Sequence, residues 1–190
     1  MKSFKRLLAV LLAIAMVFAF AACGGSDNGG ESEPAGDDQG TAATEGIPEE
    51  VFITVGDTVV QAGGNYGDYE GKLGDEIKPS ERIEPCDPEA ETADIEYYFD
   101  GLTITAKEDG LVRMVEVGAG EGNGPEILFS GKVGVGASVD EFKAIMGDRQ
   151  PDTDDDDFVA YYFDMGNLLL YLDENDHTTV TSFIMGYNDL

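Results

Sequence analysis

The chain has 190 residues, of which 39 are acidic and 11 are basic, so its formal net charge is −28 at pH 7. This charge excludes nucleic-acid binding, because a protein that binds phosphates needs the opposite sign. Two cysteines are too few for a disulfide framework or a cysteine-rich metal site, and we expect no cofactor. Such a chain attracts metal cations, basic peptides and cationic polymers. The alternative is that the charge only serves solubility.

The first 22 residues have the pattern of an export signal. Three basic residues in positions 2–6 precede sixteen uncharged residues, 7–22, a run too short to span a bilayer comfortably. The run ends in Phe20-Ala21-Ala22-Cys23, which resembles the lipobox of bacterial lipoproteins. The resemblance implies that residues 1–22 are removed and that Cys23 carries a lipid, which anchors the chain on the extracytoplasmic face of the cell membrane. The alternative is an ordinary signal peptide that leaves Cys23 as a free thiol.

The segment after Cys23 is predicted to be a disordered acidic tether. Residues 23–50 thus form one region, which consists of the lipidated cysteine and the tether. Residues 24–50 contain eight acids, no base and hardly any bulky apolar side chain. They cannot bury enough surface to offset their chain entropy, and as a flexible coil they would reach roughly 30 Å. The remaining residues, 51–190, hold 31 acids and 8 bases, a net charge of −23.

An identical four-residue sequence divides residues 51–190. Tyr97-Tyr98-Phe99-Asp100 recurs 64 residues later as Tyr161-Tyr162-Phe163-Asp164. Each copy is followed by two apolar runs around a polar turn, which predicts three consecutive antiparallel strands. We therefore expect two repeats, residues 51–118 and 125–190, joined by a flexible glycine-rich linker over 118–124.

A helix is predicted before the strands of each copy. In the second copy Ser138 and Glu141 form a capping box, residues 139–146 carry an apolar stripe, and a glycine follows. In the first copy residues 65–74 occupy equivalent places, although Gly67 and Gly71 weaken a helix by about 1 kcal/mol each relative to Ala. The sequence thus predicts an α+β fold of two tandem helix-plus-antiparallel-meander repeats that form a shared or adjoining sheet.

The loop between helix and strands is nine residues longer in the first copy, where it spans residues 75–93. Such a loop is a place for function or a tolerated insertion, and both interpretations stay open. It contains Cys86 between two prolines and two acids. Because nearby acids disfavour a thiolate, Cys86 is interpreted as a buried structural thiol; a reactive or intermolecular thiol is the alternative.

Residues 134–142, Met146-Gly147-Asp148 and the Tyr-Tyr-Phe-Asp strands together resemble the repeat of β-lactamase inhibitor proteins and of small outer-membrane assembly lipoproteins. With Leu73-Gly74 and Cys86, the chain is also similar to a group of uncharacterised lipoproteins from Gram-positive bacteria that have two such units. The resemblance implies a fold and no catalytic residue. Since proteins of this shape are mostly binding or scaffolding modules, it also implies a binding function.

The sequence predicts no catalytic residue and no enzymatic activity. The single histidine, His177, lies in a predicted hairpin turn, and no serine occupies a nucleophile elbow. Carboxylate pairs that could cleave wall polymers arise by abundance alone among so many acids. A carboxylate-based enzyme acting on wall polymers remains an alternative, which would need carboxylates that converge in a cleft.

One acidic segment allows a metal hypothesis. Asp152, Asp154 and Asp156 match the first three ligand positions of a calcium loop, but Asp157 occupies the glycine position and Phe163 the position of the bidentate glutamate. The pattern therefore fails as a helix-loop-helix site, and we predict a solvated acidic loop. Calcium binding in the millimolar range is the alternative.

The candidate interaction surface consists of Tyr98, Tyr162 and Cys86. Aromatic side chains give contact area at a low entropy cost, so they recur at recognition surfaces. The alternative is that these tyrosines pack in the core or between the repeats. The sequence predicts a membrane-anchored lipoprotein that binds a protein or a cationic ligand; a structural accessory of an envelope complex is the alternative.

Overall fold

The computed structural model of the protein describes residues 46–85 and 92–188. The predicted export signal, Cys23, the tether up to residue 45 and Cys86 lie outside the described residues, so what the sequence predicts for them stays a prediction. The described residues belong to one unit of the chain, residues 42–190.

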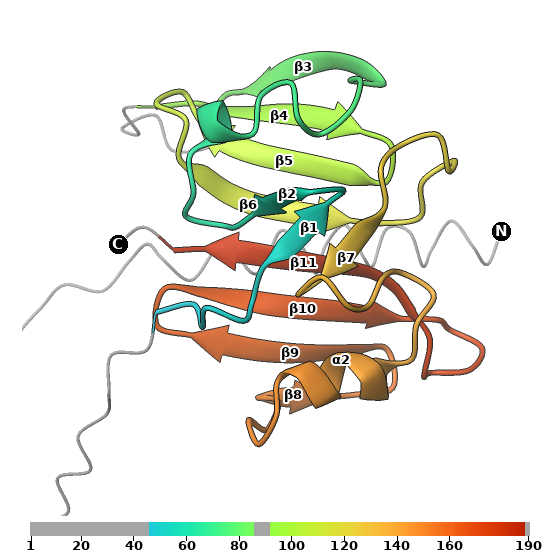
Figure 1. Ribbon diagram of the computed structural model, residues 1–190. Helices are drawn as coiled ribbons and strands as arrows, with labels where there is room; N and C mark the ends of the chain where they lie inside the picture. The colour runs from blue at the N-terminus through green and yellow to red at the C-terminus, as the bar shows by residue number, and fades with distance from the viewer. Residues whose placement is uncertain (1–45, 86–91, 189–190) are drawn as a thin grey trace, which may run out of the picture. The chain divides into compact units, whose positions relative to one another are not determined.

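An eight-stranded antiparallel sheet is the main element of this unit (Figure 1). Its strand order is β3-β4-β5-β6-β11-β10-β9-β8. The strands are β3 (Lys78–Ile83), β4 (Asp94–Phe99), β5 (Leu102–Lys107), β6 (Val112–Val117), β8 (Thr153–Asp154), β9 (Phe158–Phe163), β10 (Gly166–Leu172) and β11 (Val180–Tyr187). The sheet therefore consists of two four-stranded meanders that join along β6 and β11, where Ile184 lies opposite Glu116.

The two Tyr-Tyr-Phe-Asp sequences occupy equivalent places in the two meanders. Tyr98 of β4 lies opposite Thr103, and Tyr162 of β9 lies opposite Asn167. Each residue of the second pair is 64 positions after its counterpart in the first pair. Successive side chains of a strand point to opposite faces of the sheet. We name the face that carries Tyr161 the inner face and the face that carries Tyr162 the outer face.

A second layer covers the inner face. It consists of a small sheet of order β2-β1-β7 with β1 (Ile53–Val55), β2 (Thr58–Val60) and β7 (Ile127–Phe129), the helix α2 (Val139–Ile145) and the 3-10 turn η2 (Tyr66–Asp68). Figure 1 shows β1, β2, β7 and α2 on one side of the large sheet. Phe129 and Phe142 pack on Phe183, with ring centroids 6.0 and 5.4 Å away. Truncating such a core phenylalanine to Ala costs about 3–5 kcal/mol, so these contacts fix the layer on the sheet.

The predicted α+β fold of two tandem helix-plus-meander repeats is wrong. Within the described residues, eleven strands accompany one α-helix, α2, and the fold is dominated by antiparallel sheet. The helix α2 itself lies where the sequence predicted the second helix. The Glu141 carboxylate accepts hydrogen bonds from the Ser138 amide and hydroxyl, both at 3.0 Å, and these bonds satisfy donors at the start of the helix.

The first predicted helix is replaced by the short turn η2. The Asn65 side chain accepts a hydrogen bond from the Gly67 amide at 2.9 Å, which begins the turn. Gly71 and Gly74 then adopt φ angles of +73° and +95°, a conformation that ends helices. Residues 65–74 therefore do not repeat the geometry of α2, and this is why the first copy has a meander but no α-helix before it.

The glycine-rich segment 118–124, predicted as a flexible linker, is held by Asp100. The Asp100 carboxylate accepts hydrogen bonds from the backbone amides of Glu121, of Asn123 at 2.7 Å and of Gly124 at 3.0 Å. A Cβ atom added to Gly120 would lie 2.6 Å from the same carboxylate, so only glycine allows this close approach. The segment is thus a structured connection between β6 and β7.

Candidate interaction face

Tyr98 and Tyr162 both lie on the outer face of the large sheet, whereas their neighbours Tyr97 and Tyr161 lie on the inner face. Tyr162 is 52% exposed and Tyr161 is 0% exposed. No helix or strand among residues 46–85 and 92–188 covers the outer face (Figure 1). The alternative that Tyr162 is a core residue is therefore wrong, while its contact with a partner stays a prediction.

The outer face is mainly apolar over the neighbouring strands β6, β11, β10 and β9. Leu169 lies opposite Ala160 on one side and Ile184 on the other. The rings of Phe158 and Tyr171 lie 6.5 Å apart on the same face. We name the following partly or largely exposed side chains the apolar strip: Met114, Phe158, Tyr162, Leu169, Tyr171 and Ile184.

On the part of the outer face formed by β4, β5 and β6, glutamates on β4 and β6 lie beside threonines on β5. Glu96 of β4 lies opposite Thr105 of β5, and Glu116 of β6 lies opposite Thr103. Alternation places all four side chains on the outer face. We name Glu96, Thr105 and Glu116 the acidic cluster.

Tyr98 connects this cluster to the edge strand β3. Its hydroxyl donates hydrogen bonds to the carboxylates of Glu96 and, at 3.3 Å, of Glu81. The bond to Glu96 is the main cause that raises the pKa of Tyr98. The Lys78 ammonium nitrogen lies 3.4 Å from the centroid of the Tyr98 ring. This part of the outer face therefore already binds one cation of its own chain.

The charge of Glu96 acts on the Glu116 carboxylate. The pKa of Glu116 is raised, mainly by partial removal of its carboxylate from water and secondly by the charge of Glu96. The nearby Arg113 guanidinium forms an ion pair with Asp94 at 3.1 Å. Among the described residues no ion pair joins a base to Glu96 or Glu116, so the cluster holds two like charges.

The three aspartates of the calcium hypothesis have different partners. The Asp152 carboxylate accepts a hydrogen bond from the Tyr162 amide at 2.7 Å, and the Asp154 carboxylate pairs with Lys143 at 2.8 Å. The Asp156 carbonyl oxygen lies 2.9 Å from Nδ1 of His177. In the part of the chain that the structure describes, no group of three or more His, Cys, Asp or Glu side chains could hold a metal ion.

His177 lies in the turn between β10 and β11, where the sequence placed it. Its φ angle is +54°, and its amide donates to the Asp173 carbonyl oxygen at 2.9 Å. The Asp176 carboxylate accepts hydrogen bonds from the hydroxyl of Thr179 and from the amides of Thr178 and Thr179, and these bonds lower the pKa of Asp176 to about 2. These contacts build the turn that holds His177.

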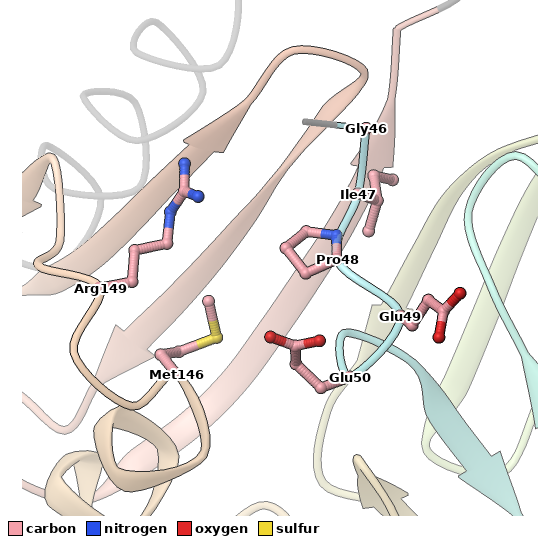
Figure 2. A pocket seen from close by; sticks show the side chains of 7 residues that line it. All are labelled: Gly46, Ile47, Pro48, Glu49, Glu50, Met146 and Arg149. Carbon is pink, nitrogen blue, oxygen red and sulfur yellow. The ribbon is translucent and has the colours of Figure 1, made fainter. Parts of the chain in front are cut away.

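A pocket of about 440 Å³ lies where the described chain begins. Its lining consists of Gly46, Ile47, Pro48, Glu49, Glu50, Met146 and Arg149 (Figure 2). Figure 2 shows that the Arg149 side chain does not point toward the carboxylates of Glu49 and Glu50. Its guanidinium donates to the Tyr162 carbonyl oxygen at 2.8 Å and lies 4.6 Å from the centroid of the Phe163 ring. The Arg149 guanidinium is therefore directed toward β9 and not toward the two glutamates.

In comparisons with known proteins, no family model, no curated protein and no solved structure matches the chain. The resemblance to β-lactamase inhibitor proteins and to lipoproteins thus stays a prediction, and function has to be argued from the chain's own residues. The described residues include no helix with the length and apolar character needed to cross a membrane.

Proposed function

We propose that the protein is a binding module that recognises a protein partner through the outer face of its large sheet. One observation carries this proposal: the apolar strip lies on a face that no described helix or strand covers, while the small sheet, α2 and η2 pack on the inner face. When one face of an antiparallel sheet is exposed to solvent, its strands normally alternate, with apolar side chains on the covered face and polar side chains on the solvated face. Apolar and aromatic side chains in contact on such a face are typical of an interaction site.

The proposed module acts outside the cytoplasm, held at the membrane by a lipid on Cys23 and by the tether over residues 24–50. The support for this part is the sequence pattern of the export signal. The charge of −23 on residues 51–190 supports a partner with basic groups, because charge complementarity speeds encounter and selects partners.

Site-directed photo-crosslinking in intact membranes tests the outer face directly. A photoreactive residue at position 162 should crosslink to a defined partner, which is then recovered from detergent-solubilised membranes. Position 59 is the matched control, because Val59 is 50% exposed but belongs to β2 of the small sheet. Equal crosslinking from both positions, or none from position 162, would overturn the proposed face.

A further inference from the structure

We propose that the acidic cluster, Glu96, Thr105 and Glu116, receives one lysine or arginine side chain of the protein partner. The inference rests on the proposed function, because the cation belongs to the partner that covers the outer face. The inference adds to the proposed function the chemical nature of one contact, a cationic side chain of the partner at the acidic cluster. Neither the apolar strip nor the net charge specifies this contact.

The positions of the three residues suit a single cationic head group. Neighbouring strands of a sheet are separated by about 4.8 Å, so β4 and β6 lie about 10 Å apart across β5. Glu96 of β4 lies opposite Thr105 of β5, and Glu116 of β6 lies opposite Thr103, so the two glutamates face each other diagonally across β5 on the same face of the sheet. Two long carboxylate side chains can therefore approach one ammonium or guanidinium group from opposite sides.

The Thr105 hydroxyl supports a ligand at this place. Thr105 is 7% exposed, and its hydroxyl oxygen has no hydrogen-bond partner among the described residues. A buried hydroxyl without a partner is unfavourable, and native structures rarely keep one without a reason. The oxygen has lone pairs that could accept an N–H of a cation lying between the glutamates.

The charges around the cluster favour the same ligand. Glu96 and Glu116 are close enough for the charge of Glu96 to affect Glu116, and no described base pairs with either of them. A cation placed between two carboxylates would replace their repulsion with attraction and form charge-assisted hydrogen bonds.

An organic cation fits this site better than a metal ion. The described residues contain no group of three or more His, Cys, Asp or Glu side chains that could hold a metal. The neighbouring Tyr98 ring already binds the Lys78 ammonium at 3.4 Å, so the same region binds an amine cation within the chain. Ile184 lies directly opposite Glu116, which joins the cluster to the apolar strip. On the partner's surface, the basic residue would therefore lie next to apolar side chains that contact the apolar strip.

Nuclear magnetic resonance of the full chain in detergent, with small cationic probes, tests the inference. The probes are N-acetylarginine amide and N-acetyllysine amide, and N-acetylnorleucine amide is the uncharged control. We expect the cationic probes to shift the backbone signals of residues 96, 105 and 116. Glu116→Gln should weaken probe binding about tenfold and Thr105→Val about threefold, because charge-assisted hydrogen bonds are about twice as strong as neutral ones.

The matched control is Glu174→Gln, which removes the same charge from an exposed residue in the turn after β10 and should leave probe binding unchanged. Signal changes spread over the acidic surface, or an equal loss of binding in Glu116→Gln and Glu174→Gln, would overturn the acidic cluster as the receptor. The crosslinking experiment separates the two proposals. Capture at position 162 that is unaffected by Glu116→Gln would keep the proposed function and reject the cation site.

Discussion

The ring of Tyr66 stacks on the ring of Tyr97, with centroids 3.6 Å apart and an interplanar angle of 15°. The pair joins η2 to β4 on the inner face of the sheet. Burial and then the charge of Glu76 raise the pKa of Tyr66 to about 12, and burial is also the main cause that raises the pKa of Tyr97. This stack makes the fold sensitive to alkaline pH.

We expect the free energy of unfolding to fall as pH rises from about 10 through about 12. Tyr66 ionises near its ordinary pKa of 10.0 in the unfolded chain but stays neutral in the folded one, so its contribution is complete below pH 10 and is lost as pH rises through the folded pKa. Urea unfolding at a series of pH values measures this, and Tyr66→Phe should have a weaker pH dependence. The same dependence in both proteins would contradict the assignment to Tyr66.

A second prediction concerns the clamp that Asp100 forms on the glycine-rich segment. Asp100→Ala should speed hydrogen exchange at the amides of Asn123 and Gly124, because their acceptor is lost. The amide bonds hold the pKa of Asp100 below 3.8, so the clamp should be complete above that pH and should weaken as pH falls through the lowered pKa.

The matched control for the clamp is Asp164→Ala in the second Tyr-Tyr-Phe-Asp sequence, where the aspartate is exposed. This variant should leave the exchange of residues 121–124 unchanged. If both variants speed exchange there equally, the effect is a general loss of stability and not the loss of the clamp.

The parts of the fold that the sequence predicted depend on local signals. The strands after each Tyr-Tyr-Phe-Asp sequence and the helix α2 follow from alternation, turn residues and a capping box. The small sheet could not be predicted in this way. Its strands β1, β2 and β7 have three residues each, too few for a period, and Ile53 pairs with Phe129 across 76 positions of sequence. That pairing is decided by packing on the inner face.

The candidate site was predicted only in part for the same reason. Tyr98 and Tyr162 could be singled out because they stand in a repeated sequence. Glu96, Thr105 and Glu116 are separated by 9 and 11 positions and become neighbours only through the pairing of β4, β5 and β6. The alternation of Glu96 and Tyr98 with apolar residues was the available signal, but it does not say which residues of other strands lie beside them.

We expect calcium at several millimolar to give no binding heat and no thermal stabilisation. Asp152 and Asp154 are engaged with the Tyr162 amide and with Lys143, so binding a calcium ion would require these contacts to break. Calorimetry on the purified protein is the measurement. A binding heat that disappears in Asp156→Asn but persists in Glu174→Gln would show that the acidic loop is a calcium site after all.

The last prediction concerns a buried hydroxyl. Tyr161 is 0% exposed, and its hydroxyl has no hydrogen-bond partner among the described residues, so Tyr161→Phe should leave the free energy of unfolding unchanged or raise it by about 1 kcal/mol. Tyr69→Phe is the matched variant, because the Tyr69 hydroxyl accepts a hydrogen bond from the Gln61 amide at 3.3 Å, and its loss should cost about 0.5–1.5 kcal/mol. Urea unfolding compares the two. An equal loss of stability in both would mean that a buried water satisfies the Tyr161 hydroxyl, since such waters bond to polar groups that the chain itself leaves unpaired.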